Sequence, residues 1–128
     1  MHALATELYP YCRSITGDGV RSTLRRLAHD IPLEVREVPS GTQVFDWTVP
    51  EEWNIRGAWI KDPQGREVIN LANHNLHVVG YSTPVRETMA LADLKPRLFS
   101  LPDQPDLIPY RTSYYKKTWG FCLPHREL

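Results

Sequence analysis

The 128-residue chain carries 15 Lys plus Arg against 15 Asp plus Glu, so its formal net charge is zero. A balanced chain without a basic block is a poor match to nucleic acid, whose phosphates need clustered cations. No apolar run reaches the roughly 18–20 residues that span a bilayer, and no signal peptide is visible at the start. Two cysteines are too few for a disulfide framework and fit a reducing cytoplasm. We therefore expect a soluble, cytoplasmic domain with neither nucleic acid nor membrane as partner.

Helical patterns occupy the first quarter of the chain. Residues 3–12 predict a short helix, and residues 19–31 predict a second one with an apolar stripe at helical spacing. Pro32 is expected to end the second helix, because the residue before a proline disfavours the helical conformation. The stripe consists of Val20, Leu24, Leu27, Ala28 and Ile31.

From residue 33 the apolar period changes from that of a helix to that of a strand. Leu33 and Val35 alternate with charged residues, which predicts a half-buried strand over residues 33–38. Residues 43–49 form a second extended run beyond a Pro-Ser-Gly-Thr turn. These two runs can pair as a hairpin.

The clearest hairpin signal is the turn sequence Asp62-Pro63-Gln64-Gly65, which lies between two apolar, β-favouring runs. Beyond it, the patterns predict a strand at 76–81, a helical turn at 88–94, a loop at 101–109 and an aromatic extended segment at 113–122. The predicted fold class is therefore α+β, with an N-terminal helical pair followed by a small, mostly antiparallel β module with hairpins.

Two pairs of residues could carry chemistry. His74 and His77 are spaced to share a metal on a helix, but on the predicted strand they would point to opposite faces. Ordinary hydrogen-bonding histidines are the favoured interpretation. Cys12 and Cys122 could be nucleophiles beside a histidine, yet buried structural thiols fit them better.

The loop over residues 13–19 contains glycines and precedes a helix, so its backbone donors could hold an anion. Its polar residues are Arg13, Ser14, Thr16 and Asp18. The Gly-Lys-Ser/Thr ending of a phosphate loop is absent, and Asp18 places negative charge where a phosphate would lie. A loop that caps the helix through Asp18 or Thr16 is the favoured interpretation.

A mixture of aromatic and cationic side chains near the C-terminus could stack nucleobases or sugars. We call this set the aromatic-cationic face, and it consists of Tyr110, Tyr114, Tyr115, Lys116, Lys117 and Trp119. A half-buried sheet face with a solvated lysine edge has the same composition and is the alternative.

Several long motifs, taken together, carry a family resemblance. They are ELYP at residues 7–10, CRSITGDGVR at 12–21, VPSGTQVFDWTVP at 38–50, and further matches as far as WGFC at 119–122. On these motifs the chain resembles the N-terminal part of bacterial zinc aminopeptidase-like proteins. In that family a small β-rich domain of unknown function is inserted near the start of the peptidase fold.

The resemblance implies an incomplete peptidase domain at residues 1–43, with its N-terminal helices and first strand, and an inserted β-rich domain at 44–128. It also implies that zinc belongs to the complete family protein, a hydrolase acting on peptide bonds. The family's metal-ligand segments, one of them resembling His-x-Cys-His-Pro, do not occur here. A two-metal site needs several carboxylates and imidazoles. We therefore expect no catalytic residue, metal ligand or cofactor in this chain, and no activity from it alone.

Two functions remain open. The chain is expected to pack against, or gate, a zinc peptidase domain, with that domain or a second copy of itself as partner and the helix stripe as a homodimer contact. Alternatively, it is a free-standing binding or assembly module that uses the aromatic-cationic face. The residues expected to contact a ligand or domain are Arg13, Ser14, Thr16, Asp18, His77, Tyr114, Tyr115, Lys116 and Trp119.

Overall fold

The structure is a computed structural model that describes residues 1–114 and 116–128. The chain forms two compact units, Met1–Ile55 and Arg56–Leu128, each described separately below. Short helices and two-stranded sheets make up both units, which confirms the α+β class. Among the described residues, no helix is long and apolar enough to cross a membrane.

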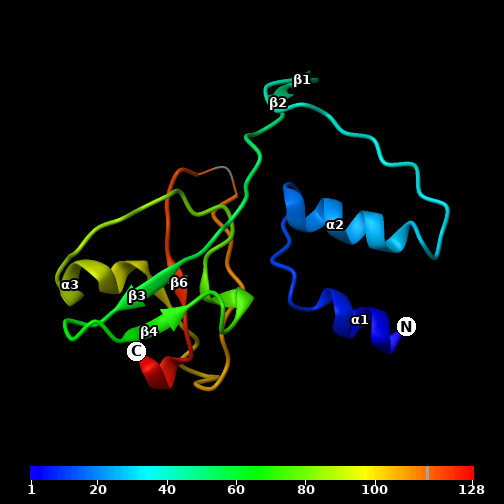
Figure 1. The fold of residues 1–128 in the computed structure, drawn as a ribbon. Coiled ribbons are helices and arrows are strands. Elements are labelled where there is room, and N and C mark those ends of the chain that lie inside the picture. Colours follow the sequence, from blue (N-terminus) through cyan, green and yellow to red (C-terminus); the bar gives the residue numbers. More distant parts are fainter. Residues whose placement is uncertain (115) are drawn as a thin grey trace. The chain divides into compact units, whose positions relative to one another are not determined.

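The first unit begins with two helices, α1 (His2–Leu8) and α2 (Asp18–Leu27), drawn in blue in Figure 1. Within α2 the stripe residues Val20, Leu24 and Leu27 are half-buried. The other two, Ala28 and Ile31, lie beyond the last helical residue and are exposed, Ile31 by 49%. The helix ends four residues before the predicted position. The amides of Asp30 and Ile31 both donate to the Leu27 carbonyl, so the chain turns out of the helix ahead of Pro32.

A small antiparallel hairpin follows, formed by β1 (Gln43–Val44) and β2 (Trp47–Thr48). Its loop is only two residues long, and Phe45 in that loop adopts a left-handed backbone with φ of 51°. The predicted strand at residues 33–38 is wrong in this structure, since those residues are exposed and outside any strand. Its predicted pairing with residues 43–49 is also wrong, because the tight turn pairs β1 with β2 locally.

The second unit contains the hairpin predicted from the turn sequence at residues 62–65, so that prediction is confirmed. Strands β3 (Trp59–Lys61) and β4 (Glu67–Asn70) pair antiparallel. The Gly65 amide donates to the Asp62 carbonyl at 2.9 Å, and Gly65 has the positive φ of 83° that favours glycine. The Asp62 side chain also accepts from the amides of Gln64 and Arg66, each at 2.9 Å.

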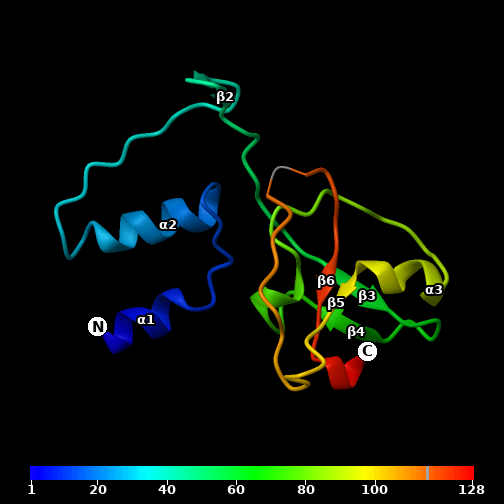
Figure 2. The ribbon, with the colours of Figure 1, turned by 180° about the vertical axis from the view of Figure 1, so that it is seen from behind.

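The rest of the second unit is assembled around a parallel strand pair. Helix α3 (Leu91–Leu94) leads through a 3-10 turn (Lys95–Arg97) into β5 (Leu98–Phe99), which pairs with β6 (Phe121–Cys122), as Figure 2 shows. A 3-10 turn (His125–Glu127) follows. The helical turn predicted at 88–94 is thereby confirmed over residues 91–94, while residues 88–90 lie outside the helix. The buried apolar residues of this unit are Ile69, Val78, Val79, Phe121, Cys122 and Leu123.

Two predicted strands of this unit are shorter than expected. The strand predicted at 76–81 begins instead as a 3-10 turn (Asn75–His77), because the His74 ring accepts a hydrogen bond from the Leu76 amide. Only isolated bridges at Val78 and Gly80 follow. Of the segment predicted at 113–122, only β6 is a strand among the described residues, and Tyr114 has a left-handed φ of 50°.

Candidate functional site

The loop before α2 is closed by residues from the end of the first unit. Gly17 is the N-cap, and its φ of 92° belongs to a region that only glycine adopts readily. The Asp18 amide, the first of α2, donates to Asn54 Oδ1 at 2.7 Å, and the Trp53 amide donates to Thr16 Oγ1 at 3.2 Å. An amide that could face an anion is therefore occupied by a side chain of the same unit.

Arg13 and Ser14, also predicted as contact residues, make short-range bonds within this unit. Arg13 Nη1 donates to the Leu8 carbonyl at 3.1 Å and lies 3.5 Å from Thr23 Oγ1. Ser14 Oγ donates to the Thr16 carbonyl at 2.7 Å. The structure thus brings Arg13, Ser14, Thr16 and Asp18 into one loop whose polar groups hold the loop itself.

Arg21 forms a charge cluster that the sequence patterns missed. Its guanidinium donates to Glu37 at 2.7 Å and to both oxygens of Glu52, the closer at 2.5 Å, while Asp18 lies 3.4 Å away. The hydrogen bonds from Arg21, helped by one from Asn54, lower the pKa of Glu52 to about 2. The same bonds to Glu52 and Glu37 raise the pKa of Arg21. These carboxylates are 16 and 31 residues away in sequence, so helix periodicity gave no signal of them.

In the second unit, His77 is buried, and its Nδ1 donates to the Cys122 carbonyl at 2.8 Å. This bond assigns the ring hydrogen to Nδ1, which leaves Nε2 as an acceptor in the neutral ring. The His74 ring lies edge-on to it with centroids 6.1 Å apart. The expectation that the two rings point to opposite faces of a strand is therefore wrong, because a 3-10 turn brings them together. Within residues 1–114 and 116–128, no three His, Cys, Asp or Glu side chains are grouped to hold a metal.

The aromatic-cationic face is only partly assembled among the described residues. Tyr114 stacks on Tyr81, with ring centroids 6.0 Å apart and planes 10° from parallel. Trp119 is half-buried, and the cation above its ring is Arg97, at 5.3 Å, rather than a lysine. Lys116 is exposed, as are Tyr110 and Lys117. Tyr115 lies outside the described residues.

Both cysteines are free thiols in surroundings that disfavour the thiolate. Cys122 is fully buried, and burial raises its pKa to about 11 although the charge of Arg111 acts in the opposite direction. Burial also raises the pKa of Cys12. Since the thiolate is the nucleophile, neither cysteine is suited to attack a substrate in this structure.

Comparison with known proteins identifies the class to which the chain belongs. Residues 52–128 match a family described as Domain of unknown function (DUF2172), and the chain is a member of that family. It is 54% identical over 127 residues to a Clostridium acetobutylicum protein provisionally named a polysaccharide biosynthesis protein with an aminopeptidase-like domain. That match covers 99% of this chain and 29% of the relative.

A solved structure gives the same result. The chain superimposes with a TM-score of 0.95 on the crystal structure of a C. acetobutylicum protein provisionally named a peptidase, at 53% identity. The match covers 98% of this chain and 30% of that chain. The resemblance to aminopeptidase-like proteins, including a domain of unknown function, is thereby confirmed. The boundary between residues 43 and 44 stays a prediction, while the compact units divide after Ile55.

Proposed function

We propose that this chain is a non-catalytic portion of an aminopeptidase-like hydrolase, and that it packs against and gates a zinc-containing peptidase domain. The observation that carries the proposal is the coverage: nearly all of the chain matches less than a third of each longer relative. The absence of a three-residue metal cluster among the described residues is consistent with a site built elsewhere. Zinc and gating come from the family resemblance.

The test uses a chimera in which this chain replaces the matched region of the C. acetobutylicum protein. The isolated chain should hold less than about 0.1 zinc per molecule and release no amine from aminoacyl anilides. The chimera should bind zinc and release amine, because a catalytic zinc needs several protein ligands and the chimera keeps the rest of the peptidase domain. Stoichiometric zinc or hydrolysis in the isolated chain would refute the proposal.

Gating has its own measurement in the chimera. If the second unit covers the entrance to the site, replacing exposed Tyr114 with Ala should change KM for long peptides more than for dipeptides, and leave kcat for dipeptides unchanged. Gln64→Ala, on the exposed hairpin turn, is the matched control. Equal effects on long and short substrates would remove gating from the proposal.

A second candidate is a carbohydrate-binding role for the aromatic-cationic face. The Tyr81–Tyr114 stack favours it, since Tyr114 remains 48% exposed, Lys116 is also exposed, and aromatic rings bind sugar faces. The name of the C. acetobutylicum relative, which refers to polysaccharide biosynthesis, points the same way. Titration with acidic oligosaccharides, followed by NMR shifts in wild type and Tyr114→Ala, separates this role from gating.

A further inference from the structure

Between α2 and β1, the backbone of residues 32–38 makes no hydrogen bond to another backbone group among the described residues. The next such bonds are those of Ile31 on one side and of Pro39 with Thr42 on the other. Figure 1 draws the segment in cyan as a long trace without helix or strand.

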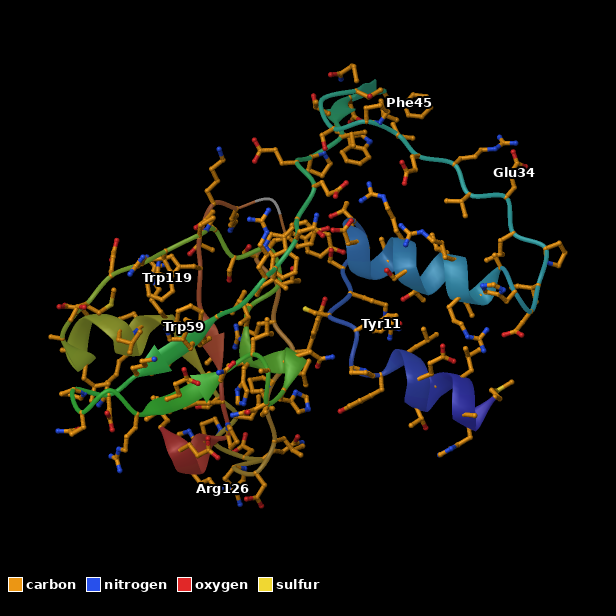
Figure 3. The ribbon with its side chains drawn as sticks, viewed as in Figure 1. Tyr11, Glu34, Phe45, Trp59, Trp119 and Arg126 are labelled. Carbon is orange, nitrogen blue, oxygen red and sulfur yellow. The ribbon has the colours of Figure 1, made fainter. Side chains whose placement is uncertain are left out.

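Side-chain geometry shows that this segment is already strand-like in its middle. Arg36 bonds to Glu34 through Nε at 2.9 Å and Nη2 at 2.8 Å, a contact between residues two apart. Side chains at i and i+2 share a side when the backbone is extended, whereas in a helix they face apart. Figure 3 labels Glu34 along this segment.

At its first positions, the other side of the segment is apolar and exposed. Leu33 and Val35 share the odd parity and are 37% and 50% exposed, whereas Glu37 of the same parity is charged. Over residues 33–36, an extended backbone with an apolar side, a charged side and unpaired amides is an open strand edge, which proteins ordinarily pair or cover. The segment is also held at one position, because Glu37 is bound by Arg21 of α2 at 2.7 Å.

We propose that residues 33–38 form a β-strand by pairing with a strand of the additional polypeptide that the longer relatives carry, with Leu33 and Val35 packed against that polypeptide. This inference rests on the proposed function and names the contact through which the chain joins its peptidase domain. Polypeptide is available for this role, since about 70% of the similar crystallised chain lies outside the match of 30%. A strand in the same polypeptide has an effective concentration of order mM, which a second copy of the chain does not reach at ordinary concentrations.

Hydrogen exchange tests the proposal without reference to activity. In the isolated chain the amides of residues 33–38 should exchange at rates near those of an open chain. In the chimera described above, every second amide, or all of them if strands lie on both sides, should exchange at least about 100-fold more slowly.

Proline variants show whether pairing is responsible. Val35→Pro and Arg36→Pro, made separately, remove neighbouring amides that point to opposite sides of a strand. At least one of them should abolish the protection in the chimera while leaving the stability of the isolated chain unchanged. Ser40→Pro is the matched control, because Ser40 precedes Gly41 in a Pro39–Thr42 turn whose first central position favours proline.

Three results would overturn the proposal. They are equally fast exchange in chain and chimera, protection that both proline variants leave intact, and protection in the isolated chain that rises with its concentration, which would show pairing with a second copy. Hydrolysis by the isolated chain would instead refute the proposed function and leave the strand pairing standing, so the two failures are distinguishable.

Discussion

Gly17 lies directly against the carbonyl oxygen of Trp53, with no room for a side chain between them. The backbone of Gly17 also occupies a glycine-only region, and a Cβ there would lie 2.7 Å from Asn54 Oδ1. The close approach allows the Asp18 amide and Thr16 hydroxyl to bond to residues 53 and 54. The loop and the end of the first unit are therefore one packed element.

Gly17→Ala should destabilise the first unit by about 1–3 kcal/mol from backbone strain, with a further loss from the clash. Gly41→Ala is the control, because Gly41 has a φ of 85° and nothing within 4 Å of an added Cβ, so only the strain of about 1–2 kcal/mol remains. Chemical denaturation followed at the amides of α2 measures both. Equal losses in the two variants would show that the contact with Trp53 is unimportant.

Stability of the first unit should fall in acid through Glu52. Its pKa is about 2 in the folded protein against an ordinary value of 4.5, so this stabilisation is present above pH 4.5 and is lost as the pH falls toward 2. Arg21→Gln should lower the melting temperature at pH 7 and flatten its decline between pH 4.5 and 2. Arg25→Gln, at an exposed position of the same helix, is the control. An unchanged pH profile in Arg21→Gln would contradict the assignment.

The Asp62 turn should depend on the side-chain oxygens of that residue. Asp62→Ala removes the acceptor for the amides of Gln64 and Arg66 and should lower the melting temperature of the second unit. Asp62→Asn keeps an acceptor oxygen and should lose less. Exchange rates of the Gln64 and Arg66 amides measure the effect. Identical rates in Ala and Asn variants would show that these bonds are not the cause.

The two thiols should react at different rates with a thiol reagent at neutral pH. Cys122 is fully buried with a pKa of about 11, so it should be labelled only on unfolding. Cys12 is partly exposed and should react first, although burial raises its pKa as well. Mass spectrometry of Cys12→Ser against wild type identifies the labelled site. Rapid labelling of Cys122 in the folded chain would contradict the burial of β6.

Features built from neighbouring residues could be predicted from the sequence, and features built from distant ones could not. The turn at residues 62–65 was predictable because Pro63 fixes its own φ and Gly65 adopts a positive φ without strain. The Arg21–Glu52 pair and the bond from His77 to the Cys122 carbonyl join residues 31 and 45 apart, which no local pattern reports. The period-two pattern at 33–38 was real, but a strand also needs a partner.

The residue type at position 45, in the loop of the β1–β2 hairpin, is unfavourable for the stability of that hairpin. Phe45 is 96% exposed, and Figure 3 shows its ring at the tip of the hairpin. A left-handed φ of 51° suits Asn or Gly, and holding a larger L-residue there costs about 1–2 kcal/mol. Phe45→Gly should therefore relieve strain while removing no buried contact. The first unit thus exposes a large aromatic ring on a backbone conformation that costs it free energy, so this hairpin is less stable than its two-residue loop would allow.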